Sequence, residues 1–351
     1  MVRTVVVTGG CGFIGSHFVR LLLRRPGWRV INFDNLTYAG NLASLQDVEG
    51  HPAYVFVRGD IADADAIDRI MKTYAPWAVV NFAAESHVDR SILDATPFLR
   101  TNILGVQTLL DAVGRHQVER YVQVSTDEVY GDAEEMAPFD EGAPLRPSSP
   151  YAASKAAADL LCLAYRRTHA APVVIARSAN NYGPFQFPEK LLPLMIRNAL
   201  ARDPLPIYGD GAQVRDWLHV EDNCAALLQV LERGQVGRVY NVATGEYRTN
   251  LEVVRAACRA VAAETAVPAS ELEGLIRFVA DRPGHDRRYA VDAARIRSEL
   301  LWRPETVFAD GLRATVRWYL DHRDWIAQVT SGEYQRYYEA VYVRRWQQSV
   351  P

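Results

Sequence analysis

The stretch Val5-Val6-Val7-Thr8-Gly9-Gly10-Cys11-Gly12-Phe13-Ile14-Gly15 places a short β-branched run directly before a glycine-rich turn. Residues 10–15 match the pattern G-x-G-x-x-G, and residues 16–24 continue as a helix-like segment. Glycines suit these positions because the turn is tight, a phosphate must approach the backbone closely, and the helix must pack against the strand. The stretch therefore predicts the first strand, turn and helix of a doubly wound α/β fold.

An acidic residue follows the glycine turn at the spacing that dinucleotide-binding folds show. Asp34 ends the next apolar run, about 20 residues after the glycines. A carboxylate there accepts hydrogen bonds from a ribose hydroxyl and would repel a 2′-phosphate, so the pattern favours NAD over NADP. Asp60 and Ile61 follow the third run and are expected near the adenine. The alternative is a glycine-rich turn without a ligand, and the combination of strand, helix and acid argues against it.

The rest of the chain alternates strand-like and helix-like segments at the spacing of crossover units. The strand-like runs are mostly β-branched, as buried parallel strands tend to be, and comprise residues 5–7, 30–33, 54–57, 78–82, 121–124 and 173–176. The prediction is an α/β fold with a doubly wound parallel sheet (Rossmann) and a smaller, interleaved C-terminal lobe. We assign residues 1–180 to the NAD-binding domain, with segments near 215–245 returning to it, and residues 181–351 mainly to the substrate lobe.

Composition excludes several classes of protein. The 351 residues are 49% hydrophobic and 23% charged, which is ordinary for a globular enzyme, and the net charge of -3 gives no footprint for nucleic acid. The opening apolar run is too short for a signal peptide and no run is long enough to span a membrane, so a cytoplasmic location without a membrane partner is expected. Four widely spaced cysteines suggest neither a disulfide framework nor a metal site, and they are interpreted as apolar fillers.

A tyrosine and a lysine stand four residues apart in Tyr151-Ala152-Ala153-Ser154-Lys155, so a helix would place both on one face. We expect the lysine cation and a positive nicotinamide ring to lower the pKa of Tyr151, which can then take a proton from a substrate hydroxyl. Lys155 is also expected to hold the nicotinamide ribose. Such a pair alone is usually solvated, but together with the glycine turn it resembles the signature of the extended short-chain dehydrogenase/reductase superfamily, whose members commonly act on sugar nucleotides.

Two adjacent acids follow the fifth strand in Val124-Ser125-Thr126-Asp127-Glu128-Val129-Tyr130-Gly131 and should lie at the carboxyl edge of the sheet, where ligands bind. Epimerases of this superfamily carry Ser or Thr here without the acidic pair. Dehydration needs both acids, with Glu128 as the base at sugar C5 and a protonated Asp127 as the acid for the C6 hydroxyl. The alternative is an exposed acidic loop, because Asp132, Glu134 and Glu135 follow.

Further segments resemble motifs of the dTDP-glucose 4,6-dehydratase family over nearly the whole chain. They are Ala83-Ala84-Glu85-Ser86-His87-Val88-Asp89-Arg90-Ser91, Pro147-Ser148-Ser149-Pro150, Asn180-Asn181-Tyr182-Gly183-Pro184, Phe187-Pro188-Glu189-Lys190-Leu191, Pro206-Ile207-Tyr208-Gly209, Arg215-Asp216-Trp217 and Asp281-Arg282-Pro283-Gly284-His285-Asp286. Ala179 departs from the family, which usually has Ser before the Asn pair.

The resemblance implies a set of site residues. The catalytic group comprises Thr126, Asp127, Glu128, Tyr151 and Lys155. The cofactor group comprises Gly9, Gly12, Phe13, Ile14, Gly15, Asp34, Asn35, Leu36, Thr37, Asp60, Ile61, Phe82, Ala83, Ala84, Ser86, Thr101, Tyr151, Lys155 and Asn181. The substrate group comprises Ser86, Thr126, Asn180, Lys190, Leu191, Pro206, Ile207, Tyr208, Arg215, Asn250, Asp281, Arg282 and His285. The cationic side chains of the substrate group suit a diphosphate, and Tyr208 suits a pyrimidine base. Considered singly, each cation could be a surface charge and the tyrosine could be a core residue.

The expected reaction converts dTDP-glucose into dTDP-4-keto-6-deoxyglucose and water through transient oxidation at C4 by bound NAD. Three alternatives stay open: a 4-epimerase or decarboxylase on the same scaffold, a dehydratase of a UDP-sugar such as UDP-glucose or a GlcNAc derivative, and an NAD-binding sensor or scaffold without turnover. The family implies a homodimer, for which residues 96–115 and 151–168 have suitable apolar faces. Residues 328–351 suggest a terminal helix of unknown role.

Overall fold

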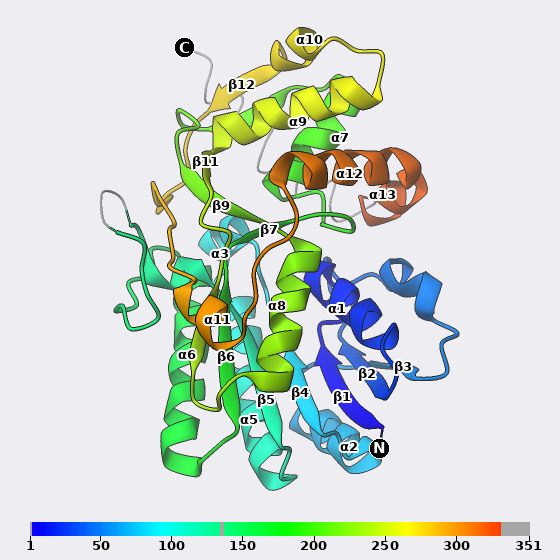
Figure 1. The fold of residues 1–351 in the computed structure, drawn as a ribbon, viewed down its shortest axis with the longest axis vertical. Coiled ribbons are helices and arrows are strands. Elements are labelled where there is room, and N and C mark those ends of the chain that lie inside the picture. The colour runs from blue at the N-terminus through cyan, green and yellow to red at the C-terminus, as the bar shows by residue number, and fades with distance from the viewer. Residues whose placement is uncertain (1, 134–136, 331–351) are drawn as a thin grey trace.

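A seven-stranded parallel sheet forms the base of the molecule in the computed structural model, which describes residues 2–133 and 137–330 (Figure 1). Its strand order is β10-β6-β5-β4-β1-β2-β3, so the chain reverses its direction of travel across the sheet between β1 and β4. The strands are β1 (Arg3–Thr8), β2 (Trp28–Asp34), β3 (Tyr54–Arg58), β4 (Ala78–Asn81), β5 (Arg120–Thr126), β6 (Val173–Ser178) and β10 (Val239–Val242). The predicted doubly wound sheet and its six strand-like runs are confirmed.

Helices cover both faces of this sheet because alternate strand residues point to opposite sides. On one face, Val5, Val7 and Val30 pack in a core with α1 (Phe13–Leu23) and α8 (Val220–Arg233). On the other face, Val6 and Ile31 pack with α2 (Ala64–Tyr74), α5 (Val106–Arg115) and α6 (Pro150–His169). Each strand therefore has apolar side chains on both faces of the sheet. This explains why its sequence is a continuous apolar run rather than an alternation of apolar and polar residues.

A second apolar core lies above the carboxyl edge of the sheet (Figure 1). It is enclosed by α7 (Leu191–Ala201), α9 (Asn250–Glu264), α10 (Ala269–Glu273), α12 (Phe308–Asp321) and α13 (Arg323–Val329). Two small sheets accompany these helices, with orders β11-β9-β7 and β12-β8. Their strands are β7 (Asn180–Tyr182), β8 (Leu205–Tyr208), β9 (Val214–His219), β11 (Tyr247–Thr249) and β12 (Ile276–Val279).

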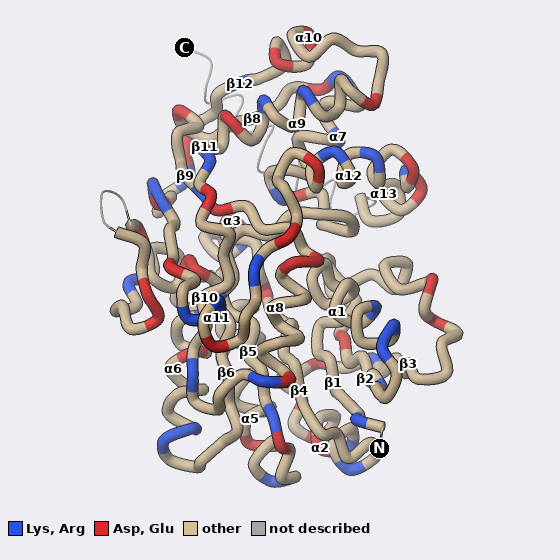
Figure 2. The backbone as a smooth tube through the Cα atoms, in the orientation of Figure 1, with Lys and Arg blue, Asp and Glu red and all other residues tan. Residues whose placement is uncertain are grey.

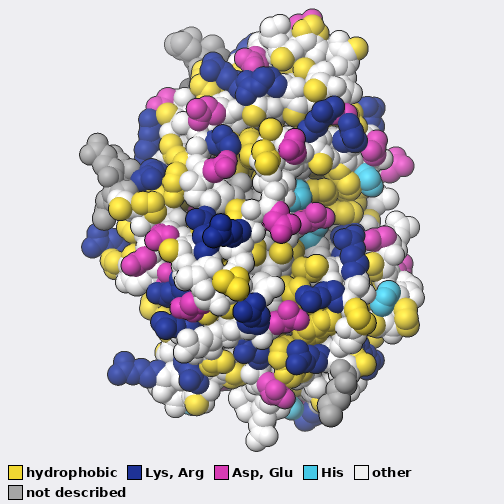
Figure 3. Space-filling view, viewed as in Figure 1, with side chains coloured by type: hydrophobic (Ala, Val, Ile, Leu, Met, Phe, Trp, Pro, Cys, Tyr) yellow, Lys and Arg dark blue, Asp and Glu magenta, His cyan; other side chains and the backbone are white. Residues whose placement is uncertain are grey.

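The chain crosses between the two cores more than once. After β7 to β9 it returns to the large sheet with α8 and β10, goes back to the second core with β11 and α9, and passes α11 (Ala294–Glu299) beside β10 before ending in α12 and α13. Leu218 and Val220 pack in the core of the large sheet, although β9 itself pairs within the small three-stranded sheet. Charged side chains of both signs are interspersed over both regions, and apolar atoms lie between them on the surface (Figures 2 and 3).

Two helical segments differ from the sequence expectation. The first helix begins at Phe13, not at residue 16, so the last glycine of the motif lies inside it. Residues 96–115 form α4 (Thr96–Phe98), a π-helical turn (Leu99–Gly105) and α5 rather than one regular helix, and α3 (Val88–Leu93) precedes them. Further 3-10 turns span Leu42–Val48 and Asp127–Tyr130.

The terminal helix expected at residues 328–351 falls mostly on residues 331–351, which lie outside the described part of the chain, as do Glu134 and Glu135.

Among the described residues, no helix combines the length and apolarity needed to cross a membrane. The described residues also contain no group of three or more His, Cys, Asp or Glu side chains placed to hold a metal ion. All four cysteines are buried and free, in keeping with their interpretation as apolar fillers.

A buried ion pair ties α6 to the sheet. Arg177 of β6 donates to Asp159 of α6 at 2.8 Å, and both side chains are almost fully buried. A second nitrogen of Arg177 donates to the hydroxyl of Tyr130 at 2.7 Å, and that hydroxyl donates to Asn241 of β10 at 2.8 Å. This network fixes α6, the helix that carries Tyr151 and Lys155, relative to β6 and β10.

We predict that Arg177→Met destabilises the protein by about 3–5 kcal/mol, because it leaves the Asp159 carboxylate buried without its cation. Chemical denaturation followed by circular dichroism measures the change. The matched control is Lys72→Met, which removes an exposed cation from its pair with Asp68 and should alter stability little. Equal losses in the two variants would contradict the role given to the buried pair.

Candidate active site

A cavity of about 300 Å³ opens at the carboxyl ends of β1, β2, β4 and β5, close to the point where the strand order reverses. Open α/β sheets bind ligands at such a position. The lining also includes the start of α6, the segment joining β6 to β7, and residues 186–190. Residues far apart in the sequence therefore meet at one edge of the large sheet.

The glycine turn packs closely against neighbouring backbone, as a G-x-G-x-x-G turn requires. Gly9 has φ +70°, and a Cβ there would lie 2.5 Å from the backbone nitrogen of Ala83. A Cβ on Gly15 would collide with the carbonyl oxygen of Gly9. The helix after the turn begins with Gly12 as its N-cap, and no side chain caps it, so its first N–H groups are available to a phosphate.

Asp34 braces the same turn. Its two carboxylate oxygens accept hydrogen bonds from the backbone N–H of Cys11 at 2.9 Å and of Leu36 at 2.8 Å. Each oxygen keeps a further lone pair for a ribose hydroxyl. Burial raises the pKa of Asp34, and these two backbone hydrogen bonds oppose that effect. The chemistry of the turn and of this acid therefore fits NAD.

The structure brings nearly all the predicted cofactor residues to the cavity. Those lining it are Gly9, Gly12, Phe13, Ile14, Gly15, Asp34, Asn35, Thr37, Asp60, Ile61, Phe82, Ala83, Ala84, Ser86, Thr101, Tyr151, Lys155 and Asn181. Leu36 is not part of the lining; it has φ +55° and packs against the core. Asp60 lies at the far end, where it accepts a hydrogen bond from Ala62 N–H and pairs with Arg100 at 3.2 Å.

The catalytic candidates come from three consecutive elements. Thr126 ends β5, Asp127 and Glu128 form the 3-10 turn that follows, and Tyr151 and Lys155 lie in the first two turns of α6. All five line the cavity. The Thr126 hydroxyl donates to Asp127 Oδ1 at 3.2 Å and accepts from the Glu128 N–H at 3.2 Å, which fixes the start of the turn. The alternative of an exposed acidic loop is wrong for this pair.

Asp127 occupies an apolar position for a carboxyl group. The residue is 3% exposed, and its Oδ2 has no hydrogen-bond partner among the described residues. Burial raises the pKa of Asp127 to about 8, and the neighbouring Glu128 adds to this rise while Arg215 opposes it. Near neutral pH this carboxyl is therefore predominantly protonated and can donate a proton into the cavity.

The tyrosine and lysine differ from expectation in one respect. Lys155 Nζ donates to the carbonyl oxygen of Val124 at 2.7 Å, and burial lowers the pKa of Lys155. Burial and the Glu128 charge raise the pKa of Tyr151 above its usual range, while the Thr126 hydroxyl lowers it. The lowering expected from Lys155 is not found: burial has the largest influence on the pKa of Tyr151, and the charges of Glu128 and Asp127 add to the rise.

The predicted substrate residues divide into two groups. Ser86, Thr126, Asn180 and Lys190 line the cavity. Lys190 Nζ donates to the carbonyl oxygen of Ser86 at 2.6 Å, which holds the cation at the wall. The members outside the lining are Leu191 at the start of α7, Pro206, Ile207 and Tyr208 in β8, Arg215 in β9, Asn250 at the start of α9, and Asp281, Arg282 and His285 after β12.

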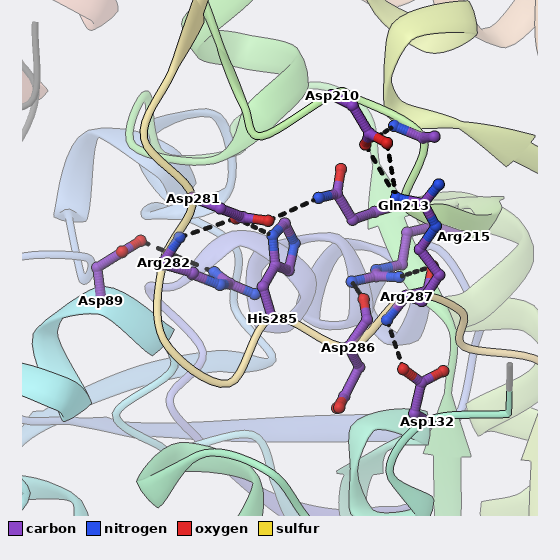
Figure 4. A network of polar contacts seen from close by, with 11 residues as sticks. Asp89, Asp132, Asp210, Gln213, Arg215, Asp281, Arg282, His285, Asp286 and Arg287 are labelled. Carbon is purple, nitrogen blue, oxygen red and sulfur yellow. Dashed lines mark hydrogen bonds and ion pairs between the residues drawn. The ribbon is translucent and has the colours of Figure 1, made fainter. Parts of the chain in front are cut away.

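Four of these outer residues belong to one polar network (Figure 4). Asp281 accepts from His285 at 2.6 Å and from Gln213 at 2.9 Å, and Arg282 lies 3.7 Å from Asp89. Arg215 donates to the backbone oxygen of Asp286 at 2.9 Å. Burial lowers the pKa of His285, and the neighbouring Arg282 and Arg215 add to this fall while Asp281 opposes it.

Sequence reasoning missed several residues of the site. Glu189 lines the cavity, is almost fully buried, and lies 3.3 Å from Arg90; burial raises its pKa to about 7. It stands inside a motif quoted above, so its position offered a signal. Asp132 is exposed, as expected for a solvated acidic run, and it also accepts hydrogen bonds from the N–H groups of Arg287 at 2.6 Å and Arg288 at 3.0 Å. Tyr289, 3.5 Å from Glu128, carried no signal in the sequence.

Comparisons with known proteins identify relatives over nearly the full length of the chain. Residues 6–315 match the family described as GDP-mannose 4,6 dehydratase. The dTDP-glucose 4,6-dehydratase of Neisseria meningitidis serogroup B is 49% identical, covering 95% of this chain and 98% of that protein. The enzyme of the same name from Salmonella typhimurium is 46% identical, covering 97% and 99%.

Comparison with solved structures identifies relatives of the same kind. The dTDP-glucose 4,6-dehydratase of Streptomyces venezuelae, crystallised with NAD, superposes with a TM-score of 0.88 at 47% identity, covering 93% of this chain and 100% of that one. The UDP-glucose 4-epimerase of Thermus thermophilus, also solved with NAD, reaches 0.82 at 32% identity, covering 91% and 100%. The fold is thus shared with epimerases, whereas the higher identities are with dehydratases. This chain belongs to the dTDP-glucose 4,6-dehydratase family of the extended short-chain dehydrogenases/reductases.

Proposed function

We propose that this protein is an NAD-dependent hydro-lyase that converts dTDP-glucose into dTDP-4-keto-6-deoxyglucose and water. The observation that carries the proposal is the pair of adjacent carboxyls in one cavity with Tyr151 and Lys155, where Asp127 is buried with a raised pKa and an unpartnered oxygen. An epimerase has no use for a protonated acid beside a second carboxyl, because it moves a hydride at one carbon only.

The glycine turn, Asp34 and Lys155 would hold the cofactor against the carboxyl edge of the sheet. NAD held there would supply a hydride acceptor for sugar C4 and a hydride donor for C6, and its positive ring would favour the Tyr151 phenolate. The helix N-terminus after Gly12 takes the pyrophosphate, and Asp34 takes the adenosine ribose. Asp60 and Ile61 line the end of the cavity assigned to the adenine.

The protein residues then act in sequence on the hexose. Tyr151 removes the O4 proton, and Thr126 orients that hydroxyl. The C4 ketone acidifies the C5 proton, which Glu128 removes as general base. Asp127 protonates the departing C6 hydroxyl, which leaves as water. Once a hydride has returned to C6, the proton held by Glu128 goes back to C5, and exchange through solvent moves the O4 proton from Tyr151 to Asp127. Two carboxyls in contrasting surroundings thereby take opposite roles.

The nucleotide end lies beyond the cavity, toward the second core. We assign Lys190, Arg215 and Arg282 to the diphosphate and Tyr208 to the pyrimidine ring, because guanidinium groups offer paired donors and the phenol offers an aromatic face. We therefore assign NAD binding to residues 1–180 together with the returning segments near 215–245. We assign sugar-nucleotide binding mainly to residues 181–351. The return of α8 and β10 to the large sheet supports that division.

We further propose a cytoplasmic homodimer. Leu99, Leu104 and Leu160 are 50%, 55% and 57% exposed and lie on helical segments 96–115 and 151–168. Exposed leucines on adjacent helices favour a self-complementary contact between two copies. The four free thiols suit a reducing compartment.

Incubation of the purified protein with dTDP-glucose tests the reaction. We expect loss of one water per substrate by mass spectrometry and a 4-keto product by NMR. Formation of dTDP-galactose without loss of water would instead establish an epimerase, and bound nucleotide with no turnover would establish a sensor or scaffold. A parallel incubation with UDP-glucose and a UDP-GlcNAc derivative tests the base, and faster conversion of either would reassign the substrate.

Glu128→Gln should lower turnover about 100-fold or more, because the amide cannot take the C5 proton. Incorporation of solvent deuterium at C5, followed by NMR, should disappear, while affinity for the nucleotide persists. Exchange at the wild-type rate would show that another group is the base.

Asp127→Asn is the matched variant, since it should keep C5 exchange while elimination slows about 100-fold. In the wild type the acid works only while protonated, so elimination should fall as the pH rises through about 8, the raised pKa of Asp127. The asparagine cannot ionise, so the residual rate should lose this alkaline limb. Unchanged turnover in the variant would remove Asp127 as the acid.

The dimer proposal is tested by the double variant Leu104→Glu and Leu160→Glu, which should sediment as a monomer because charges replace the apolar contact. The control is Leu301→Glu, a leucine 74% exposed at a site away from these helices. Equal molar masses for both variants would refute this interface.

A further inference from the structure

The loop after β2 is held at both ends by the glycine turn. At its start, Asp34 accepts from the backbone N–H of Cys11 at 2.9 Å, and at its end the N–H of Asn41 donates to the carbonyl oxygen of Cys11 at 3.1 Å. Between these ends, Thr37 and Gly40 line the cavity. The loop therefore forms one wall of the proposed NAD site.

Tyr38 occupies the middle of this loop and is turned the other way. It is not part of the cavity lining, and its side chain packs against the second core. Its ring centre lies 5.6 Å from that of Phe187, with an interplanar angle of 75°. Phe187 itself lines the cavity, in the segment 186–190 that precedes α7. Tyr38 therefore joins the cofactor loop to a segment assigned to the sugar nucleotide.

Two charged side chains complete this contact. The guanidinium carbon of Arg90, in α3, lies 3.9 Å from the centre of the Tyr38 ring, where a cation–π attraction operates. The Tyr38 hydroxyl donates to the Glu189 carboxylate, and Arg90 Nε lies 3.3 Å from the same carboxylate. Because the Glu189 side chain is almost fully buried, water cannot readily replace a lost partner. Tyr38, Arg90 and Glu189 thus form one closed set of contacts among three segments.

The far side of this set reaches the residues assigned to the diphosphate. Lys190 Nζ donates to the carbonyl oxygen of Ser86 at 2.6 Å, just before α3 begins. Within α3, Asp89 lies 3.7 Å from Arg282. A nucleotide that engages Lys190 and Arg282 would hold α3 and the segment 186–190 in one arrangement. Tyr38 would pass that restraint to the loop that forms a wall of the NAD site.

We propose that Tyr38 is a positioning residue that links the two binding sites, so that a nucleotide bound at the second lobe slows the release of NAD. The inference rests on the proposed function for the identity of the two ligands, and it requires no turnover. Such a link suits the proposed reaction, because the hydride taken from C4 must still be in the site when C6 is ready to receive it.

Release of bound NAD from the whole protein tests the proposal. Protein carrying labelled NAD is diluted into unlabelled NAD with or without saturating dTDP, and the label that it retains is followed with time. In the wild type we expect dTDP to slow release about 10-fold, which lies within the usual range of coupling between two sites.

Tyr38→Leu keeps an apolar side chain against the second core but loses the ring and the hydroxyl, so this ratio of release rates should fall below about twofold. Tyr38→Phe keeps the ring beneath Arg90 and loses only the hydroxyl, so its ratio should be intermediate, about threefold. The ratio is taken within each variant, so that a general loss of stability or of NAD affinity does not by itself change it.

The matched control is Tyr54→Phe, a phenol of the cofactor half that packs in the core of the large sheet. Its hydroxyl accepts at 2.9 Å from Asn32, which also donates to the Cys11 thiol of the glycine turn. The ratio in this variant should equal that of the wild type.

Equal release with and without dTDP in the wild type would overturn the proposal, as would a wild-type ratio in Tyr38→Leu. An equal loss of the ratio in Tyr54→Phe would also overturn it, because any disturbance near the NAD site would then suffice. Failure of the proposed function is recognised separately, by the absence of water loss from dTDP-glucose, since dTDP itself undergoes no reaction.

Discussion

Asp127 and Glu128 are adjacent in the chain but lie in different surroundings, and this difference underlies the proposed chemistry. Asp127 is enclosed at the end of β5, where burial and its neighbour's charge raise its pKa to about 8. Glu128 is partly exposed in the same cavity and meets Tyr289. Placing one carboxyl against the sheet and the next toward the second core separates a proton donor from a proton acceptor without any change of residue type.

The sheet makes that separation possible. Parallel strands bring the ends of β1, β2, β4 and β5 to one edge, so the glycine turn, Asp34 and the acidic turn meet although more than a hundred residues separate the first from the last. The Arg177–Asp159 pair keeps α6 in register with β6, which holds Tyr151 and Lys155 beside the acids. A small shift of α6 would separate the phenol from Thr126, and proton transfer depends steeply on such distances.

The large sheet could be predicted from the sequence because each buried strand is a continuous β-branched run. The proposed NAD site could be predicted as well, because its glycines and Asp34 follow a local sequence pattern. Leu36 lies outside the cavity lining because its left-handed backbone turns it toward the core, which no local pattern announces. The start of α1 at Phe13 was missed because all the glycines were interpreted as a turn, although Gly15 already lies inside the helix. Tyr151 followed a spacing rule, but its pKa depends on burial that the spacing does not contain.

Tyr289, Asp286 and Asp132 were beyond prediction for a different reason. Each acts on a segment more than 70 residues away: Tyr289 on Glu128, the Asp286 carbonyl on Arg215, and Asp132 on the N–H groups of Arg287 and Arg288. The turn after β5 and the loop after β12 therefore hold each other through hydrogen bonds from both directions. One segment carries the acid and base and the other carries the cations assigned to the diphosphate, so these hydrogen bonds join the two parts of the proposed site.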